Sequence, residues 1–205
     1  MRAIIIILLF LFSLCDNEAN SQNSFINGRN NIKVGVSYYP PLQNSNNYLN
    51  WRAELNHGFT RFLEAGAYLG YSKFYAYPPG GGGGSAPTPF YGITANFHLL
   101  PLIVKQRDFR FDFYLSGKFG GNYYFTPDKD WTPARGHRTE YGLGLGLSFY
   151  VFKKLGFFTE YTIGHFSYFD NLSFSATDYY DSGIQTNFRF GLTYKYSRMS
   201  HLKQE

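Results

Sequence analysis

Apolar and polar residues alternate along eight stretches of this chain, with the period of two that is typical of a β-strand. In the clearest stretch, residues 141–149, Tyr, Leu and Phe alternate with Gly and Ser. The pattern predicts strands at about 31–39, 50–59, 62–75, 90–99, 109–121, 138–152, 155–166 and 184–196. Strands with one apolar and one polar face are stable against a protein core or in a lipid bilayer, so the next question is which of the two surrounds them.

The connections between these stretches alternate in length. The long ones, which are rich in Pro, Gly, Asn, Asp and Ser, are 40–49, 76–89, 122–137 and 167–183. Thr60-Arg61 and Lys153-Lys154 are tight turns. Such alternation is typical of an up-and-down barrel, and an even number of strands places both termini on the short-turn side, the periplasm. We expect the prolines around the glycine run to keep residues 78–89 from pairing as a strand.

The N-terminal segment, residues 1–21, has the pattern of a cleavable export signal. Arg2 precedes an apolar run over residues 3–14, and small residues follow at 19–21. The run is shorter than the about 20 residues that a transmembrane helix needs. We therefore expect a barrel over residues 22–196 and a polar tail over 197–205. The mature chain would contain no cysteine and hence no disulfide.

The two faces of the predicted strands differ in bulk as well as polarity. One carries large apolar residues such as Phe113, Leu145 and Phe190, and the other carries charged residues and glycines. An eight-stranded barrel has an interior only just wide enough for side chains to fill, so many phenyl rings could not converge there. The apolar face should therefore contact lipid. The fold prediction is all-β: an eight-stranded antiparallel up-and-down transmembrane β-barrel.

The charges on the other face would then line the lumen. The predicted bases are Lys33, Arg52, Arg110, Lys118, Arg189 and Lys195, and the predicted acids are Glu54, Glu64, Asp112, Glu140 and Glu160. Buried charge is costly unless it is paired, and these two sets nearly balance. We expect a salt-bridged, hydrated plug. A narrow, gated porin-type channel is the alternative for the same residues.

Aromatic residues are enriched near both ends of the predicted strands, as the two interfaces of a bilayer favour. The last strand, residues 187–196, alternates aromatic and polar residues to its end. In these features the chain resembles the OmpA/OmpX-like small outer-membrane barrels, and the last strand resembles their assembly signal, although nine residues follow it here. The resemblance implies a monomer in the outer membrane of a Gram-negative bacterium. It also implies contact with membrane lipid and lipopolysaccharide, recognition by the outer-membrane insertion machinery, and a structural, adhesion or surface-interaction role through extracellular loops that bind a ligand not yet identified.

One motif suggests chemistry. His165 and Ser167 lie two residues apart on one face of the seventh predicted strand, where a histidine can act as base for a serine nucleophile. The pair resembles the His-x-Ser of PagL-like lipid A deacylases, but Tyr168 stands where that family has Asn, and no acidic partner for the histidine is evident. The five histidines lack metal-site spacing, so no metal or cofactor is expected, and His98 is expected to form hydrogen bonds in the lumen. The formal net charge of +5 does not indicate nucleic-acid binding.

Overall fold

The protein is described by a computed structural model that places residues 26–38, 49–76, 84–103, 110–125, 135–165 and 185–197. The predicted export signal, residues 1–21, lies outside the described residues, and so does the predicted tail apart from Ser197. Within the described ranges, no helix is long and apolar enough to cross a membrane.

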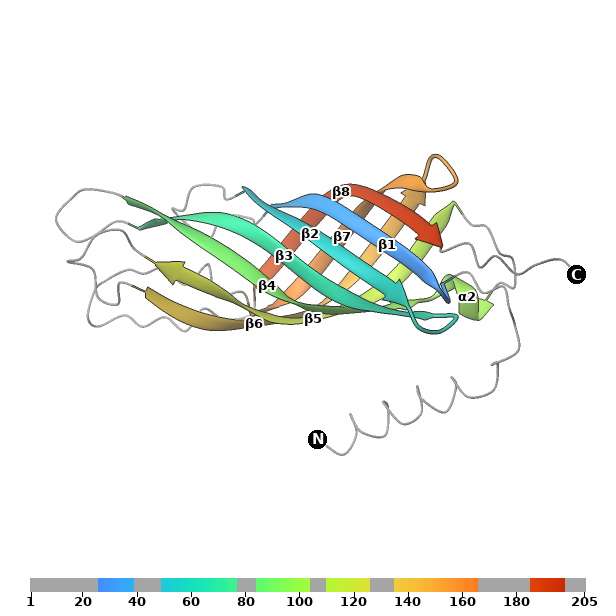
Figure 1. Ribbon diagram of the computed structural model, residues 1–205, viewed down its shortest axis with the longest axis horizontal. Coiled ribbons are helices and arrows are strands. Elements are labelled where there is room, and N and C mark those ends of the chain that lie inside the picture. The colour runs from blue at the N-terminus through green and yellow to red at the C-terminus, as the bar shows by residue number, and fades with distance from the viewer. Residues whose placement is uncertain are drawn as a thin grey trace, which may run out of the picture.

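Eight antiparallel strands form one closed barrel, in which each strand pairs with its neighbours in sequence and the first pairs with the last (Figure 1). The strands are β1 (Arg29–Tyr38), β2 (Leu49–Gly58), β3 (Leu63–Ala76), β4 (Gly84–His98), β5 (Phe111–Phe125), β6 (Arg135–Tyr150), β7 (Leu155–His165) and β8 (Gln185–Ser197). A single helical turn, α2 (Leu100–Ile103), connects β4 to β5. The predicted fold class, an up-and-down barrel of eight strands, is confirmed.

Short connections gather at one end of the barrel. The β2–β3 turn, the β6–β7 turn and α2 lie at the end where β1 begins and β8 ends (Figure 1). Gly28, whose φ of +70° favours glycine, donates its backbone N–H to the carbonyl of Gly58 over 2.9 Å. This bond holds the segment before β1 against the end of β2, where the Ile26 side chain is fully buried. We call this the short-turn end, and the opposite end the long-loop end.

Strands β3 to β6 extend farther toward the long-loop end than predicted. Residues 84–89 pair with β3 from Ala76↔Gly84 to Tyr71↔Pro89, so the prediction that prolines would keep 78–89 unpaired is wrong for this part. Among the described residues, the pairing of β4 with β5 begins at Phe90, and a proline, which has no N–H to donate, is tolerated beyond the point where a strand pairs on both sides. Likewise β5 and β6 pair as far as Phe125↔Arg135, within the predicted connection 122–137.

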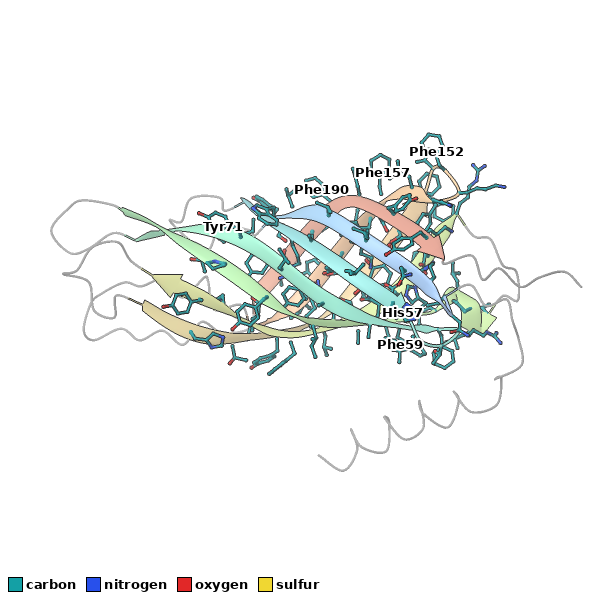
Figure 2. All side chains as sticks on the ribbon, in the orientation of Figure 1. His57, Phe59, Tyr71, Phe152, Phe157 and Phe190 are labelled. Carbon is teal, nitrogen blue, oxygen red and sulfur yellow. The ribbon has the colours of Figure 1, made fainter. Side chains whose placement is uncertain are left out.

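The two faces of the wall have the predicted orientation. Side chains alternate between exposed and buried along β7, and the outward-facing Leu143 and Leu145 are 74% and 61% exposed. Phe157 and Phe190 project outward from the wall in Figure 2. Lys33, in contrast, is completely buried inside the barrel. The apolar side chains therefore face the surroundings and the charged ones face the lumen.

Large aromatic rings also lie inside the barrel: Tyr68, Phe90, Tyr114, Tyr150 and Phe158 are buried. Glycines at the paired positions of the adjacent strands make room for two of them. A Cβ at Gly146 would lie 2.1 Å from Cζ of Tyr114, and a Cβ at Gly70 would lie 2.2 Å from Cζ of Phe90. The inward-facing glycines thus leave room for these two rings to lie over the neighbouring strand inside the barrel.

Candidate functional site: a buried ionic network in the lumen

The centre of the network joins four strands. Arg189 on β8 forms ion pairs with Glu54 on β2 and with Glu160 on β7, where Nη2 lies 3.3 Å from Oε2 of Glu160. Lys118 on β5 contacts Glu160 as well, and its Nζ is 3.9 Å from Oε1 of Glu54. All four side chains are buried. This central cluster has two positive and two negative groups and therefore compensates its own charge.

A second cluster lies at the short-turn end. Arg29 is positioned by the start of β1, and its Nη2 lies 3.2 Å from Oε2 of Glu64 on β3 and 3.2 Å from Oδ2 of Asp112 on β5. Asn96 donates a hydrogen bond to Oε1 of Glu64 over 3.1 Å. His98 Nδ1 is 2.7 Å from Oδ1 of Asp112, in line with the hydrogen-bonding role expected for this histidine. One guanidinium thus bridges two carboxylates that are already fixed by hydrogen bonds.

A third cluster lies toward the long-loop end. Tyr68 Oη donates a hydrogen bond of 2.5 Å to Oε1 of Glu140, and Nη2 of Arg52 lies 3.5 Å from the same oxygen. The Arg52 guanidinium is also 4.2 Å from the ring centroid of Tyr68 and 4.9 Å from that of Phe90. Cation–π attraction therefore adds to the ion pair and fixes the guanidinium between two rings.

Two lysines contact rings inside the barrel. Lys33 Nζ lies 3.9 Å from the ring centroid of Tyr114, and within the described ranges it has no hydrogen-bond partner. Lys195, which is half-buried near the end of β8, has its Nζ 4.1 Å from the ring centroid of Tyr150. For Lys33, the negative face of the aromatic ring stabilises a charge that has left water.

The structure buries nine of the eleven predicted lumenal charges, and the exceptions are Arg110 and the half-buried Lys195. Arg110 is exposed, because β5 begins at Phe111 and Arg110 lies just before the strand. Its alternation parity is that of an inward-facing residue, but alternation has meaning only within the strand. Arg29, in contrast, was not predicted to be lumenal, because the predicted first strand began at residue 31 whereas β1 begins at Arg29. With Arg29 added to Lys33, Arg52, Lys118 and Arg189, five buried cations face five buried carboxylates among the described residues.

The buried aromatic residues were also missed by the sequence analysis. Tyr114 has the same parity as Asp112 and Lys118 on β5, and Phe158 has the same parity as Glu160 on β7. Parity could have identified them as lumenal. Too many rings for the lumen to hold face lipid, but a few rings lie inside, where glycines on the neighbouring strands leave room for them.

Of the predicted hydrolytic pair His165 and Ser167, the described residues include only His165. His165 ends β7 on the outer face, half-buried, with its ring stacked on Tyr141 at a centroid distance of 5.6 Å and an interplanar angle of 22°. Ser167 lies outside the described residues, so the His165–Ser167 hypothesis stays a prediction. Across the part of the chain that the structure describes, no three His, Cys, Asp or Glu residues gather in a group that could hold a metal ion.

Comparison with known proteins gives a relationship in structure and none in sequence. No protein-family model and no curated protein sequence matches the chain. Among solved structures, the N-terminal β-barrel domain of Pseudomonas aeruginosa OprF is similar with a TM-score of 0.52 and 11% identity, over 83% of this chain and 98% of that one. Neisserial surface protein A (NspA) is similar with a TM-score of 0.49 and 11% identity, over 83% of this chain and 96% of that one. The chain thus has the fold of the small, eight-stranded outer-membrane barrels.

Proposed function

We propose that this chain is an integral protein of the bacterial outer membrane, with a closed lumen and no enzymatic activity, which anchors surface loops rigidly in the membrane. The observation that carries the proposal is the inverted polarity of the wall. Five cations and five carboxylates are buried inside, while the outer face presents Leu, Ile, Val and aromatic side chains. Such an arrangement is stable when hydrocarbon surrounds the barrel.

The contacts in the lumen support closure. The central cluster joins β2, β5, β7 and β8 across the axis, and the buried rings of Tyr114 and Phe158 contact Lys33 beside it. To conduct ions, the barrel would have to separate these pairs, which leaves buried charges uncompensated. The filled lumen therefore supports the role of a membrane anchor for loops over that of an ion channel.

The unequal strand lengths support a role at the long-loop end. Strands β3 to β6 have 14 to 16 residues, whereas β1 and β2 have 10 each. In Figure 1 these longer strands project beyond β1 and β2 at the long-loop end. Two long hairpins would carry their connections, residues 77–83 and 126–134, away from the membrane surface. Loops on such a scaffold are where binding residues concentrate.

Loop deletion on intact cells tests this function. We expect protease added to whole cells to cut within residues 77–83 or 126–134 and to spare the strands. Deleting either connection should remove binding to host cells or matrix proteins while the barrel keeps its resistance to heat and detergent. A protein that resists external protease throughout, or whose binding survives both deletions, contradicts the loop role.

Two further measurements separate the alternatives. In planar bilayers the purified barrel should show no single-channel current. A steady conductance would show that the protein is a channel and not a closed anchor. Mass spectrometry of lipid A should show the same acylation with and without the protein. Loss of an acyl chain that depends on His165 and Ser167 would instead establish the deacylase.

A further inference from the structure

The segment before β1 turns inward at the short-turn end of the barrel. Gly28, with its φ of +70°, donates its N–H to the carbonyl of Gly58 over 2.9 Å. The N–H of Arg29 donates to the carbonyl of Ile26, also over 2.9 Å. These two hydrogen bonds fix the backbone of Ile26 beside the last residue of β2.

Ile26 covers the inner face of β2. Gly58 has the same alternation parity as Arg52 and Glu54, which point into the lumen. A Cβ at Gly58 would lie 1.9 Å from the carbonyl oxygen of Ile26 and 2.9 Å from its Cγ2. Ile26 therefore occupies the space inside the barrel mouth that a side chain at position 58 would fill, and it is completely buried there.

The other side of the same mouth is covered by Tyr150, the last residue of β6. Strands β2 and β6 lie on opposite sides of the closed barrel. Tyr150 is buried, and the Nζ atom of Lys195 lies 4.1 Å from its ring centroid. Glu64, which is paired with Gly58 in the β2–β3 register, is completely buried and forms an ion pair with Arg29. The ionic cluster of the short-turn end thus begins directly behind an apolar cover.

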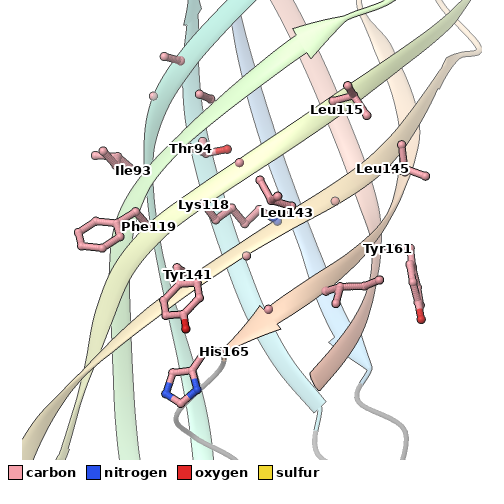
Figure 3. Close-up of a pocket in the computed structure, with 18 residues that line it drawn as sticks. Ile93, Thr94, Leu115, Lys118, Phe119, Tyr141, Leu143, Leu145, Tyr161 and His165 are labelled. Carbon is pink, nitrogen blue, oxygen red and sulfur yellow. The ribbon is translucent and has the colours of Figure 1, made fainter. Parts of the chain in front are cut away.

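The long-loop end of the lumen is lined differently. Its inward-facing residues are polar, and Ser37, Asn50 and Thr88 are examples. Between the two ends the wall is continuous, because every strand pairs with both of its neighbours. In Figure 3 the Lys118 side chain lies on the inner side of this wall, whereas Leu145 extends from the outer side. Solvent therefore reaches the lumen only through its ends, one of which is polar and the other apolar.

We propose that Ile26 is a stopper that closes the lumen at the short-turn end and keeps solvent away from the ionic cluster at Arg29. Excluding water matters there, because ion pairs are weaker where water can enter. Water would then enter the lumen from the long-loop end. The position of the stopper relative to the membrane rests on the proposed function: with the long loops outside the cell, the stopper closes the lumen toward the periplasm.

Cysteine labelling of the folded, processed protein in detergent micelles tests the stopper, because a water-soluble reagent reaches both ends of the barrel there. The single cysteine of the sequence, Cys15, lies in the predicted export signal, so a processed Ser148→Cys chain carries one thiol. Ser148 is buried, is paired with Asp112 in the β5–β6 register and has no hydrogen-bond partner within the described ranges. We expect this thiol to react slowly with a charged methanethiosulfonate. Ser37→Cys is the second reporter, at the long-loop end.

Removing the stopper should expose only the nearer reporter. Ile26→Gly should raise the labelling rate of Ser148→Cys at least about tenfold, because the packing of a buried isoleucine is lost and the mouth opens more often. The rate of Ser37→Cys should not change. Gly58→Ala should act in the same direction, since its Cβ would displace the Ile26 carbonyl. Ile32→Gly is the matched control: it makes the same substitution at an exposed position of β1 and should leave both rates unchanged.

A milder variant changes only the turn before β1. A Cβ at Gly28 would meet nothing within 4 Å, but a β-branched residue is strained at a φ of +70°. Gly28→Val should therefore raise the rate at Ser148→Cys by a smaller factor than Ile26→Gly. Gly28→Asn should stay closer to the wild type, because Asn tolerates the left-handed region. The heat-dependent shift in electrophoretic mobility verifies folding, and Gly28→Val replaces Ile26→Gly in the test if the latter does not fold.

Three outcomes overturn the stopper: an unchanged rate at Ser148→Cys when Ile26 is removed, an equal rise at Ser37→Cys, or an equal rise in the Ile32→Gly control. The second would show general loosening of the barrel and not the opening of one mouth. If the folded wild type does not insert into phospholipid vesicles, the proposed function has failed. The labelling result in micelles still decides whether Ile26 closes the lumen.

Discussion

Glycine occurs on both faces of the barrel wall, but its surroundings differ between the inner and the outer face. At Gly146 on the inner face, the ring of Tyr114 occupies the space that a Cβ would take. At Gly117 on the outer face, that space is open. Inside the barrel, bulky side chains such as Tyr114 fold over the neighbouring strand and fill the space above its glycines, whereas the outward-facing Gly117 has no such cover. The same substitution should therefore have very different consequences on the two faces.

The largest effect is expected where the inner face loses a shared charge. Glu160→Gln removes the carboxylate that contacts both Lys118 and Arg189, and it should lower the free energy of unfolding by about 3–5 kcal/mol because buried cations lose their compensation. Urea unfolding in phospholipid vesicles, followed by circular dichroism, measures the change. The double variant Lys118→Met/Glu160→Leu should recover much of the loss, and a double variant no better than Glu160→Gln would contradict the coupling.

A charge on the outer face should cost somewhat less. Leu145→Arg places a base on a side chain that is 61% exposed in the apolar face, and it should destabilise the inserted barrel by about 2–4 kcal/mol, as expected near the membrane midplane. The same vesicle-based unfolding experiment applies, with Leu145→Phe as the control that should remain close to the wild type. An unaffected Leu145→Arg variant would show that this position does not face lipid.

A glycine-to-alanine substitution on each face compares the two faces by the addition of one methyl group. Gly146→Ala should destabilise the barrel by about 1–3 kcal/mol, because the added Cβ would overlap the Tyr114 ring and force it to move. Trimming the ring with Tyr114→Val should make the Gly146→Ala change nearly neutral when the two are compared in that background. If Gly146→Ala costs the same in both backgrounds, the ring is not the obstacle.

The smallest effect is expected at the matching outward position. Gly117→Ala should change the free energy of unfolding by no more than about 0.5 kcal/mol, because its Cβ would meet only ordinary contacts. Measured beside Gly146→Ala under identical conditions, it provides the control for the glycine-to-alanine change itself. A loss as large as that of Gly146→Ala would remove the contrast between the two faces.

Alternation predicted the faces of the strands well but failed at their ends. It assigned Lys118 and Glu160 to the inside and Leu145 to the outside, where the structure has them. It included Arg110, which lies just before β5, and it excluded Arg29, which lies inside β1. Strand ends depend on whether a partner continues alongside. This also explains why Gly84–Pro89 pairs with β3 despite its prolines.

The sequence by itself determined that eight two-faced strands would close into a barrel with its charges inside, because the alternation of side chains is a local property of an extended chain. Only the tertiary structure decided which charges meet. Arg189 contacts Glu54 although the two are 135 residues apart in sequence, and Arg29 joins Glu64 to Asp112. These pairings depend on the register of every strand and on the pairing of β1 with β8. Register and closure are set by contacts between segments that lie far apart in the sequence. The same holds for the outward-facing residues Ala65, Ala95 and Gly117, which become neighbours only through register.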